Sequence, residues 1–190
     1  MKELVFLLEE ESAKAMLESL LPRILEEEIA LRYMVFEGKQ DLEKQMMKRM
    51  RGYINPQARF IVLRDQDSFP DCVVLKARLM EKCRLAGKEG VALVRIACRE
   101  LESFYLADLA AVERGLGVAG LAISQERARF RNPDDLQSPS RELRALTNST
   151  YQKVGGSREI GKHLDPNNER SRSFRNMLTG IDRMQRSLLA

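Results

Sequence analysis

The sequence predicts an α/β protein whose central sheet is mainly parallel. Short, unbroken apolar runs such as Leu4 to Leu8 alternate with segments whose apolar residues recur at helical spacing. The connections are long enough for each helix to lead from one strand to a parallel neighbour, which makes right-handed βαβ units. Helices then cover both faces of the sheet, so we expect three layers in this chain of 190 residues.

The first 112 residues contain the alternating elements. A helix is expected to begin at Ser12, a residue type that commonly caps helices, and its apolar face continues to Leu25. Phe60 to Leu63 is the clearest strand, because it is rich in aromatic and β-branched residues. In chain order, the prediction is strand 4–8, helix 12–25, strand 31–36, helix 41–50, strand 60–63, helix 72–85, strand 91–98 and helix 100–112.

The chain changes character beyond Gly115. Prolines and glycines break it into short helices and loops, and residues 173–189 form a predicted terminal helix. We therefore expect a core at residues 1–112 and an extension at 113–190 that packs on it. Residues 127–190 carry 13 Lys or Arg against 7 Asp or Glu, whereas residues 1–126 carry 19 against 21. The basic extension indicates an anionic partner such as nucleic acid, or a solvated arginine-rich surface that maintains solubility.

Composition and motifs argue against several classes of protein. No apolar run approaches the roughly 18 residues that a membrane helix needs. The apolar start is too short for a signal peptide, so we expect a cytoplasmic protein with no membrane association. Three cysteines without a CxxC pair indicate neither a disulfide framework nor a zinc site. P-loop and dinucleotide motifs are absent, and the lone His163 supports no catalytic triad.

Acidic side chains follow three of the four predicted strands. Glu9 follows the first strand, Asp65 and Asp67 follow the third, and Glu100 and Glu102 follow the fourth. Ligands of open α/β sheets bind where the strands end, and a hard divalent cation neutralises crowded carboxylates. We therefore expect these five residues to hold Mg²⁺ or Mn²⁺. The alternative is that such acids cap the following helix or complement its dipole.

The same residues carry a resemblance to two known groups of proteins. In residues 1–105, a strand ending in Glu and a later strand ending in Asp-x-Asp resemble the Toprim fold of topoisomerases, primases and OLD-type nucleases. Most of the chain is similar to a prokaryotic family, domain of unknown function 4276. The stretches that carry this likeness are LLEEESA (7–13), FEGKQDL (36–42), LRDQDS (63–68), RIACRELESFYL (95–106), YQK (151–153) and SRSF (171–174). The resemblance implies a Toprim-like Rossmannoid three-layer fold with a basic, mostly helical C-terminal extension.

The Toprim resemblance also implies metal-dependent phosphodiester chemistry. By position, Glu9 would serve as general acid/base or metal ligand, and Asp65 and Asp67 would hold Mg²⁺. The usual first motif is Glu-Gly-x-x-Asp/Glu, but here Glu10 replaces the glycine and Ala13 replaces the second acid. This departure leaves open whether the site is active.

A second stretch, Glu37-Gly38-Lys39-Gln40-Asp41, fits the first motif better by letters. It lies only one strand–helix unit before Asp65, whereas Toprim topology places two units between the two motifs. We therefore favour Glu9 as the residue of the first motif.

Basic residues of the extension are the expected substrate contacts. Lys153 is the preferred single phosphate contact, because an ammonium group could stabilise charge that develops during phosphoryl transfer. Arginine suits phosphate because its planar fork binds two oxygens at once. The alternative for each is a solvated surface cation. The expected nucleic-acid contacts are Arg127, Arg129, Arg131, Arg158, Lys162, Arg172 and Arg175.

Three functions remain open from the sequence. The first is a Mg²⁺-dependent nuclease or phosphodiesterase of Toprim type. The second is a catalytically degenerate partner subunit of an ABC- or SMC-type ATPase, and the third is a nucleotide phosphohydrolase. Relatives are often encoded beside such ATPases, in what resemble anti-phage defence modules, so the resemblance implies an ATPase partner. A homodimer is compatible with the sequence.

Overall fold

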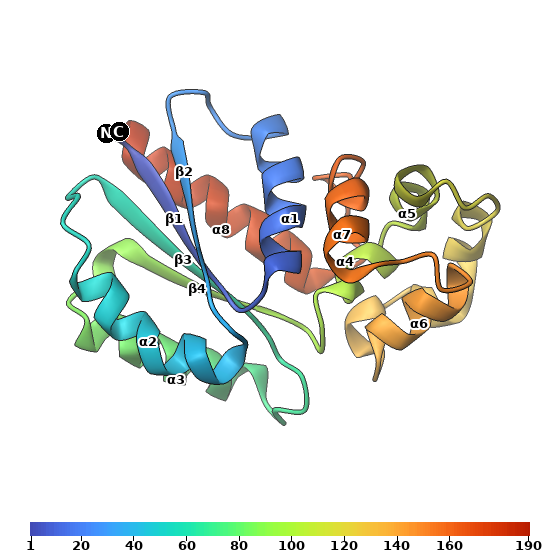
Figure 1. Cartoon of the computed structure of the whole chain (residues 1–190), viewed down its shortest axis with the longest axis horizontal. Coiled ribbons are helices and arrows are strands. Elements are labelled where there is room, and N and C mark those ends of the chain that lie inside the picture. Colours follow the sequence, from blue (N-terminus) through green and yellow to red (C-terminus); the bar gives the residue numbers. More distant parts are fainter.

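The computed structural model describes all residues 1–190 and contains one four-stranded sheet. The strands are β1 (Glu3–Leu8), β2 (Ala30–Val35), β3 (Ala58–Asp65) and β4 (Ala92–Ala97). They are all parallel and lie in the order β2-β1-β3-β4 (Figure 1). The predicted α/β class with a parallel sheet is therefore confirmed.

Eight α-helices surround the sheet. They are α1 (Glu11–Leu20), α2 (Lys39–Arg51), α3 (Cys72–Leu85), α4 (Glu102–Leu106), α5 (Leu109–Leu116), α6 (Pro139–Leu146), α7 (Lys153–Gly161) and α8 (Arg172–Leu189). Short 3₁₀ turns lie at residues 21–23, 89–91, 122–126, 128–130 and 133–135. In Figure 1, α1 and α8 cover one face of the sheet and α2 and α3 cover the other, while α5, α6 and α7 lie beyond the carboxyl ends of the strands.

The sheet is buried on both faces, which explains why its strands are unbroken apolar runs. On β1, Phe6 and its alternate neighbours belong to a cluster of 32 buried residues that also includes residues of α1 and α8. Val5 and Leu7 belong to a second cluster of 15 buried residues that includes residues of α2 and α3. Successive side chains of a strand point to opposite faces, so β1 contributes to both clusters.

The C-terminal third packs directly against the N-terminal half. On α7, a Cβ added at Gly161 would lie 2.7 Å from the carbonyl oxygen of Met16 on α1, so these helices approach each other at backbone distance. On α8, a Cβ at Gly180 would lie 2.6 Å from the Arg95 guanidinium and from Leu93, both on β4. The expected boundary at residue 112 falls inside α5, and the larger core cluster runs across it. We propose that the two parts unfold together.

Three predicted details of the helices are wrong. Helix α1 begins at Glu11 with Glu10 at its N-cap, and the Ser12 hydroxyl donates to Glu10 instead of capping the helix. The helix ends at Leu20 rather than continuing to Leu25. The single helix expected over residues 100–112 is two helices, because the Asp108 carboxylate accepts from the N–H of Ala111 and starts α5.

No helix of this protein combines the length and the apolar character that a membrane crossing requires.

Candidate active site

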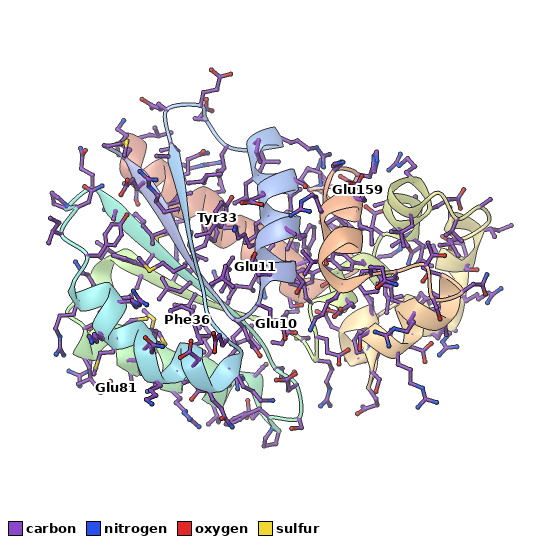
Figure 2. The ribbon with its side chains drawn as sticks, viewed as in Figure 1. Glu10, Glu11, Tyr33, Phe36, Glu81 and Glu159 are labelled. Carbon is purple, nitrogen blue, oxygen red and sulfur yellow. The ribbon has the colours of Figure 1, made fainter.

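The strand order places a ligand-binding position between β1 and β3. After β1 the chain turns to the α1 face and adds β2 on one side, and it later crosses over to add β3 on the other side of β1. Such reversals of strand order are where open α/β sheets bind ligands, at the carboxyl ends of the strands. Glu9 follows β1 and Asp65 ends β3, so both lie at this position. Figure 2 shows Glu10 and Glu11 where β1 leads into α1, at the same edge.

Glu9 and Asp65 form the centre of the site. The N–H of Asp65 donates to Oε2 of Glu9 over 3.2 Å, and the Glu9 side chain is buried. Burial raises the pKa of Glu9, and the charge of Asp67 raises it further. Burial also raises the pKa of Asp65 well above its ordinary value, with the nearby carboxyls of Glu102 and Glu9 adding to the effect. Both acids are therefore biased towards their protonated forms, first by burial and then by their carboxyl neighbours.

Asp67 lies on the loop that follows β3 and has a left-handed backbone, with φ +53°. Its N–H donates to the carbonyl of Arg99 over 2.6 Å, which ties the loop after β3 to the loop after β4. The Lys39 ammonium donates to Oδ2 of Asp67 over 2.8 Å, and this bond raises the pKa of Lys39. Lys39 is thus the cation that faces Asp67.

Glu100 and Glu102 have different surroundings although both follow β4. Oε2 of Glu100 accepts from the N–H of Ser140 over 2.7 Å, in the first turn of α6. Glu102 is only 2% exposed, and its Oε1 accepts from the Tyr151 hydroxyl over 2.9 Å. Burial raises the pKa of Glu102. Glu102 is therefore an acid buried next to Asp65, whereas Glu100 holds the start of a helix.

Lys153 is the second cation at this edge. It begins α7 and forms an ion pair with Glu10. Burial lowers the pKa of Lys153, but the hydrogen bond and charge of Glu10, with the charges of Glu102 and Asp65, outweigh it and raise the pKa. The sequence-predicted phosphate contact therefore lies beside the predicted acids, as a charged ammonium.

Comparison with known proteins identifies the family. Residues 8–182 match the family described as a domain of unknown function (DUF4276). This chain is a DUF4276 protein.

A solved structure supports the fold of this DUF4276 chain. The C-terminal region of the Burkholderia pseudomallei OLD protein is similar to it with a TM-score of 0.55 and 14% sequence identity. The likeness covers 97% of this chain and 98% of that one. At this identity the likeness concerns the fold alone, and it confirms the Toprim-like α/β arrangement that the sequence predicted. A search of curated proteins gave no match.

The donor set of the DUF4276 site fits a hard divalent cation. Glu9, Asp65 and Asp67 offer only oxygen atoms, which Mg²⁺ and Mn²⁺ prefer. Burial raises the pKa values of Glu9 and Asp65, and repulsion from neighbouring carboxyls adds to the effect; a cation would relieve that repulsion. As placed, no three Asp, Glu, His or Cys side chains form a ready-made ligand cluster. We propose that metal binding draws Asp67 away from Lys39 and towards the other two acids.

The two acids of the competing first motif form no hydrogen bond or salt bridge with Glu9, Asp65 or Asp67. Glu37 is exposed, and its own N–H donates to Oδ2 of Asp41 at the start of α2. Lys39 lies in the same stretch and contacts Asp67, although it was not among the site residues predicted from the sequence. Gly38 has φ +88° directly before it, so the Gly-Lys pair at a strand end was the available signal.

The expected nucleic-acid contacts are spread over the surface of the C-terminal third, and all of them are exposed. Arg129 pairs with Glu142, and Lys162 pairs with Glu159 on α7, the acid labelled in Figure 2. Arg172 lines a cavity beside β4. The others are Arg175, which lies 3.9 Å from Glu169, and Arg127, Arg131 and Arg158, which form no salt bridge.

Proposed function

We propose that this DUF4276 protein is a metal-dependent phosphodiesterase of Toprim type that acts on nucleic acid. One observation carries the proposal. Glu9 and Asp65 meet at the reversal of strand order, joined by the 3.2 Å bond from the Asp65 N–H, and both have raised pKa values. A buried acid and a half-buried acid with raised pKa values, side by side at neighbouring strand ends, are candidates for a functional site.

Glu9, Asp65 and Asp67 would hold the metal. A bound Mg²⁺ or Mn²⁺ would polarise the scissile phosphate and lower the pKa of a water molecule. Oε2 of Glu9 is occupied by the Asp65 N–H, so Oε1 is the atom that can take a proton from the attacking water. The raised pKa of Glu9 brings it closer to neutral pH, where a general base is more effective.

The two lysines have separate roles in this mechanism. Lys153 would leave Glu10 and place its ammonium against the phosphate, stabilising charge that develops in the transition state. Lys39 would release Asp67 when the divalent cation replaces it as the counter-charge. Both side chains are about half exposed, so these movements require no opening of the core.

Fold similarity supports a working context for this activity. In the OLD protein this fold forms the C-terminal region of a longer chain. We propose that the present protein acts in the cytoplasm with an ABC- or SMC-type ATPase, as the effector of an anti-phage defence module.

A second function is favoured by the details of the first motif. Ala13 stands where a second acid is usual, and Lys39 neutralises Asp67 without any metal. These features suit a degenerate partner subunit of an ATPase, which would retain the fold and lose the chemistry.

Cleavage of supercoiled plasmid and of total RNA with Mg²⁺ or Mn²⁺ separates the two functions. We expect wild type and Glu37→Gln to cut at least one of these substrates and Asp65→Asn/Asp67→Asn to cut neither. Glu37→Gln is the matched control, because it removes an exposed acid from the competing motif. No cutting by wild type, with or without an added ATPase partner, would favour the degenerate subunit. Cutting that survives in the double variant would show that the site is misplaced.

A further inference from the structure

A cavity of about 880 Å³ lies along the open edge of β4. Its walls come from α3, from the start of α8 and from the turn at residues 132–137. Figure 1 shows β4 at the margin of the sheet, with α3 and α8 on opposite faces. The volume lies within the roughly 300–1,000 Å³ of small-molecule sites, so one nucleotide fits.

Unpaired positive charge surrounds this cavity. Lys76, Arg95, Arg99 and Arg172 line it, and none of them is in a salt bridge. The side chains of Lys76 and Arg172 make no hydrogen bond to any other residue. Cations that neither pair nor donate remain available to phosphate oxygens.

The acids of the cavity are already engaged. Asp134 accepts from the hydroxyls of Ser171 and Ser173 over 2.7 and 3.1 Å, and from the Ser173 N–H over 2.7 Å, at the start of α8. Asp135 accepts from the Asn132 amide. These acids serve the local fold and form no salt bridge with the four cations, which outnumber them four to two among the lining residues.

The remaining walls suit a nucleobase. The side-chain amides of Gln137 and Asn176 line the cavity without a hydrogen-bond partner, and such amides match the donor and acceptor edges of bases. Ile96 and Val73 supply apolar surface, and Val73 is 70% exposed although it is a large apolar residue. The cavity therefore offers cations for a phosphate, side-chain amides for the edge of a base and apolar side chains for its face.

The cavity borders the chain segment that carries two of the acids. Gln66 lies between Asp65 and Asp67 in the chain and lines the cavity, and its Oε1 accepts from the Arg99 N–H over 3.4 Å. The end of β3, which carries Asp65, therefore leads into a residue that lines the same cavity as the four cations. We propose that this cavity binds a nucleoside phosphate, namely one unstacked nucleotide of the strand to be cut, held next to the acids. That the bound nucleotide belongs to a nucleic-acid strand about to be cut rests on the proposed function.

A peptide strand added to the β4 edge fits these observations less well. The Arg95 guanidinium donates to the carbonyl of Val94 over 2.9 Å, and the Cys98 N–H donates to the Ser173 hydroxyl over 3.3 Å. One carbonyl of β4 and the N–H directly after the strand are therefore already occupied. The bases of a duplex are stacked inside the helix, so an intact duplex could not place a base against the side-chain amides of Gln137 and Asn176.

Binding of short oligonucleotides without metal tests the cavity. A labelled 10-nucleotide single strand, its duplex and mixed mononucleotides are titrated in EDTA, with anisotropy and competition as readouts. We compare wild type with Lys76→Gln/Arg172→Gln, and use Arg84→Gln/Arg186→Gln as the control that removes two exposed cations elsewhere. Both cations of the control lie in exposed ion pairs, with Glu81 and Asp182.

We expect Lys76→Gln/Arg172→Gln to weaken single-strand binding about tenfold or more and to reduce the slope of log affinity against log salt by about 1.4, since each phosphate contact contributes about 0.7. The control should stay within about twofold. Asn176→Ala should weaken binding without changing the salt slope, because it contacts the base. Competition by mononucleotides would assign the same site to free nucleotides.

Several results would overturn the inference. Equal losses in the two double variants would show that only net charge matters, and tighter binding of duplex than of single strand would exclude an unstacked nucleotide. If wild type bound none of the oligonucleotides or mononucleotides, the cavity would not be a nucleotide site. If wild type and Lys76→Gln/Arg172→Gln cleave equally with Mn²⁺, the cavity is wrong while the acidic site stands. If wild type binds the single strand but cleaves nothing, the cavity stands while the proposed nuclease function is wrong.

Discussion

Two charged regions of this DUF4276 protein differ in how their charges are compensated. At the carboxyl edge of the sheet, Glu9 and Asp65 are crowded and have raised pKa values. On the surface of the C-terminal third, cations such as Arg129 and Lys162 are exposed and paired with acids of the same surface. The comparison teaches that an excess of one charge in a segment does not locate a site. We propose that a site is marked instead by acids that crowd together at one edge of the sheet.

The largest effect is expected at Lys153, where the basic third reaches the acidic edge. Lys153→Met should lower kcat for phosphodiester cleavage about 100-fold, in the range found when a group that stabilises transition-state charge is removed, with little change in KM. Single-turnover and steady-state cleavage rates measure this. Lys48→Met removes an exposed lysine of α2 and should leave kcat unchanged. A rate loss seen only in KM would make Lys153 a binding residue alone.

The next effect concerns the close contact between α7 of the C-terminal third and α1 of the N-terminal half. Gly161→Ala would force a Cβ to within 2.7 Å of the Met16 carbonyl oxygen, so we expect a loss of about 1–3 kcal/mol in the free energy of unfolding. The matched control is Gly155→Ala on the same helix, where a Cβ meets nothing within 4 Å. It should be neutral or stabilising by up to about 1 kcal/mol. Urea unfolding followed by circular dichroism measures both, and two separate transitions would contradict a shared core.

A third prediction sharpens the description of the acidic edge. A carboxyl with a raised pKa binds its proton more tightly in the folded state, so stability falls as pH rises from the ordinary range through the raised pKa. Asp65→Asn removes this penalty. Without metal, it should raise the free energy of unfolding at pH 7 by about 1 kcal/mol or more, because a pKa raised by one unit corresponds to about 1.4 kcal/mol.

The sign of this effect has its own check. As the pH falls below the ordinary pKa of about 3.9, the carboxyl becomes mostly protonated in both states, so most of the advantage of Asp65→Asn should be lost there. Urea unfolding at pH 7 and at pH 3.5, both in EDTA, measures the difference. A variant that is less stable than wild type at pH 7 would mean that the Asp65 carboxylate is well compensated.

The smallest effect is expected on the basic surface. Arg129→Gln breaks an exposed ion pair with Glu142, and such pairs contribute about 0–1 kcal/mol. We expect stability to change by less than about 0.5 kcal/mol, and oligonucleotide affinity by less than about twofold. Thermal unfolding and anisotropy titration measure these quantities. A tenfold loss of affinity would restore this surface as the substrate platform.

Much of the fold was predictable because its signals are local. The unbroken apolar runs of β1 and β3 and the helical spacing of α3 reflect burial on two faces or on one, which periodicity reports directly. The division between α4 and α5 was missed because apolar residues continue through it. Asp108 is the only local mark of the break, and its capping role depends on where the chain turns.

The site was predictable in part for the same reason. Glu9 and Asp65 follow strands, and the order of parallel strands brings strand ends together. The contact of Lys39 with Asp67 and the capping of α6 by Glu100 depend on how loops pack, which no local pattern reports. The four cations around the β4 cavity come from α3, β4, the loop after β4 and α8 and are therefore scattered in the sequence.

We propose that Glu9, Asp65 and Asp67 hold a divalent metal, and a Mn²⁺ titration is the first experiment to make. Mn²⁺ is titrated calorimetrically, with electron paramagnetic resonance of free Mn²⁺ as a second readout, into wild type, Glu37→Gln and Asp65→Asn/Asp67→Asn. We predict saturable binding of equal affinity to wild type and Glu37→Gln, and at least about tenfold weaker binding to the double variant. Equal binding to all three proteins, or no binding to wild type, would contradict the account.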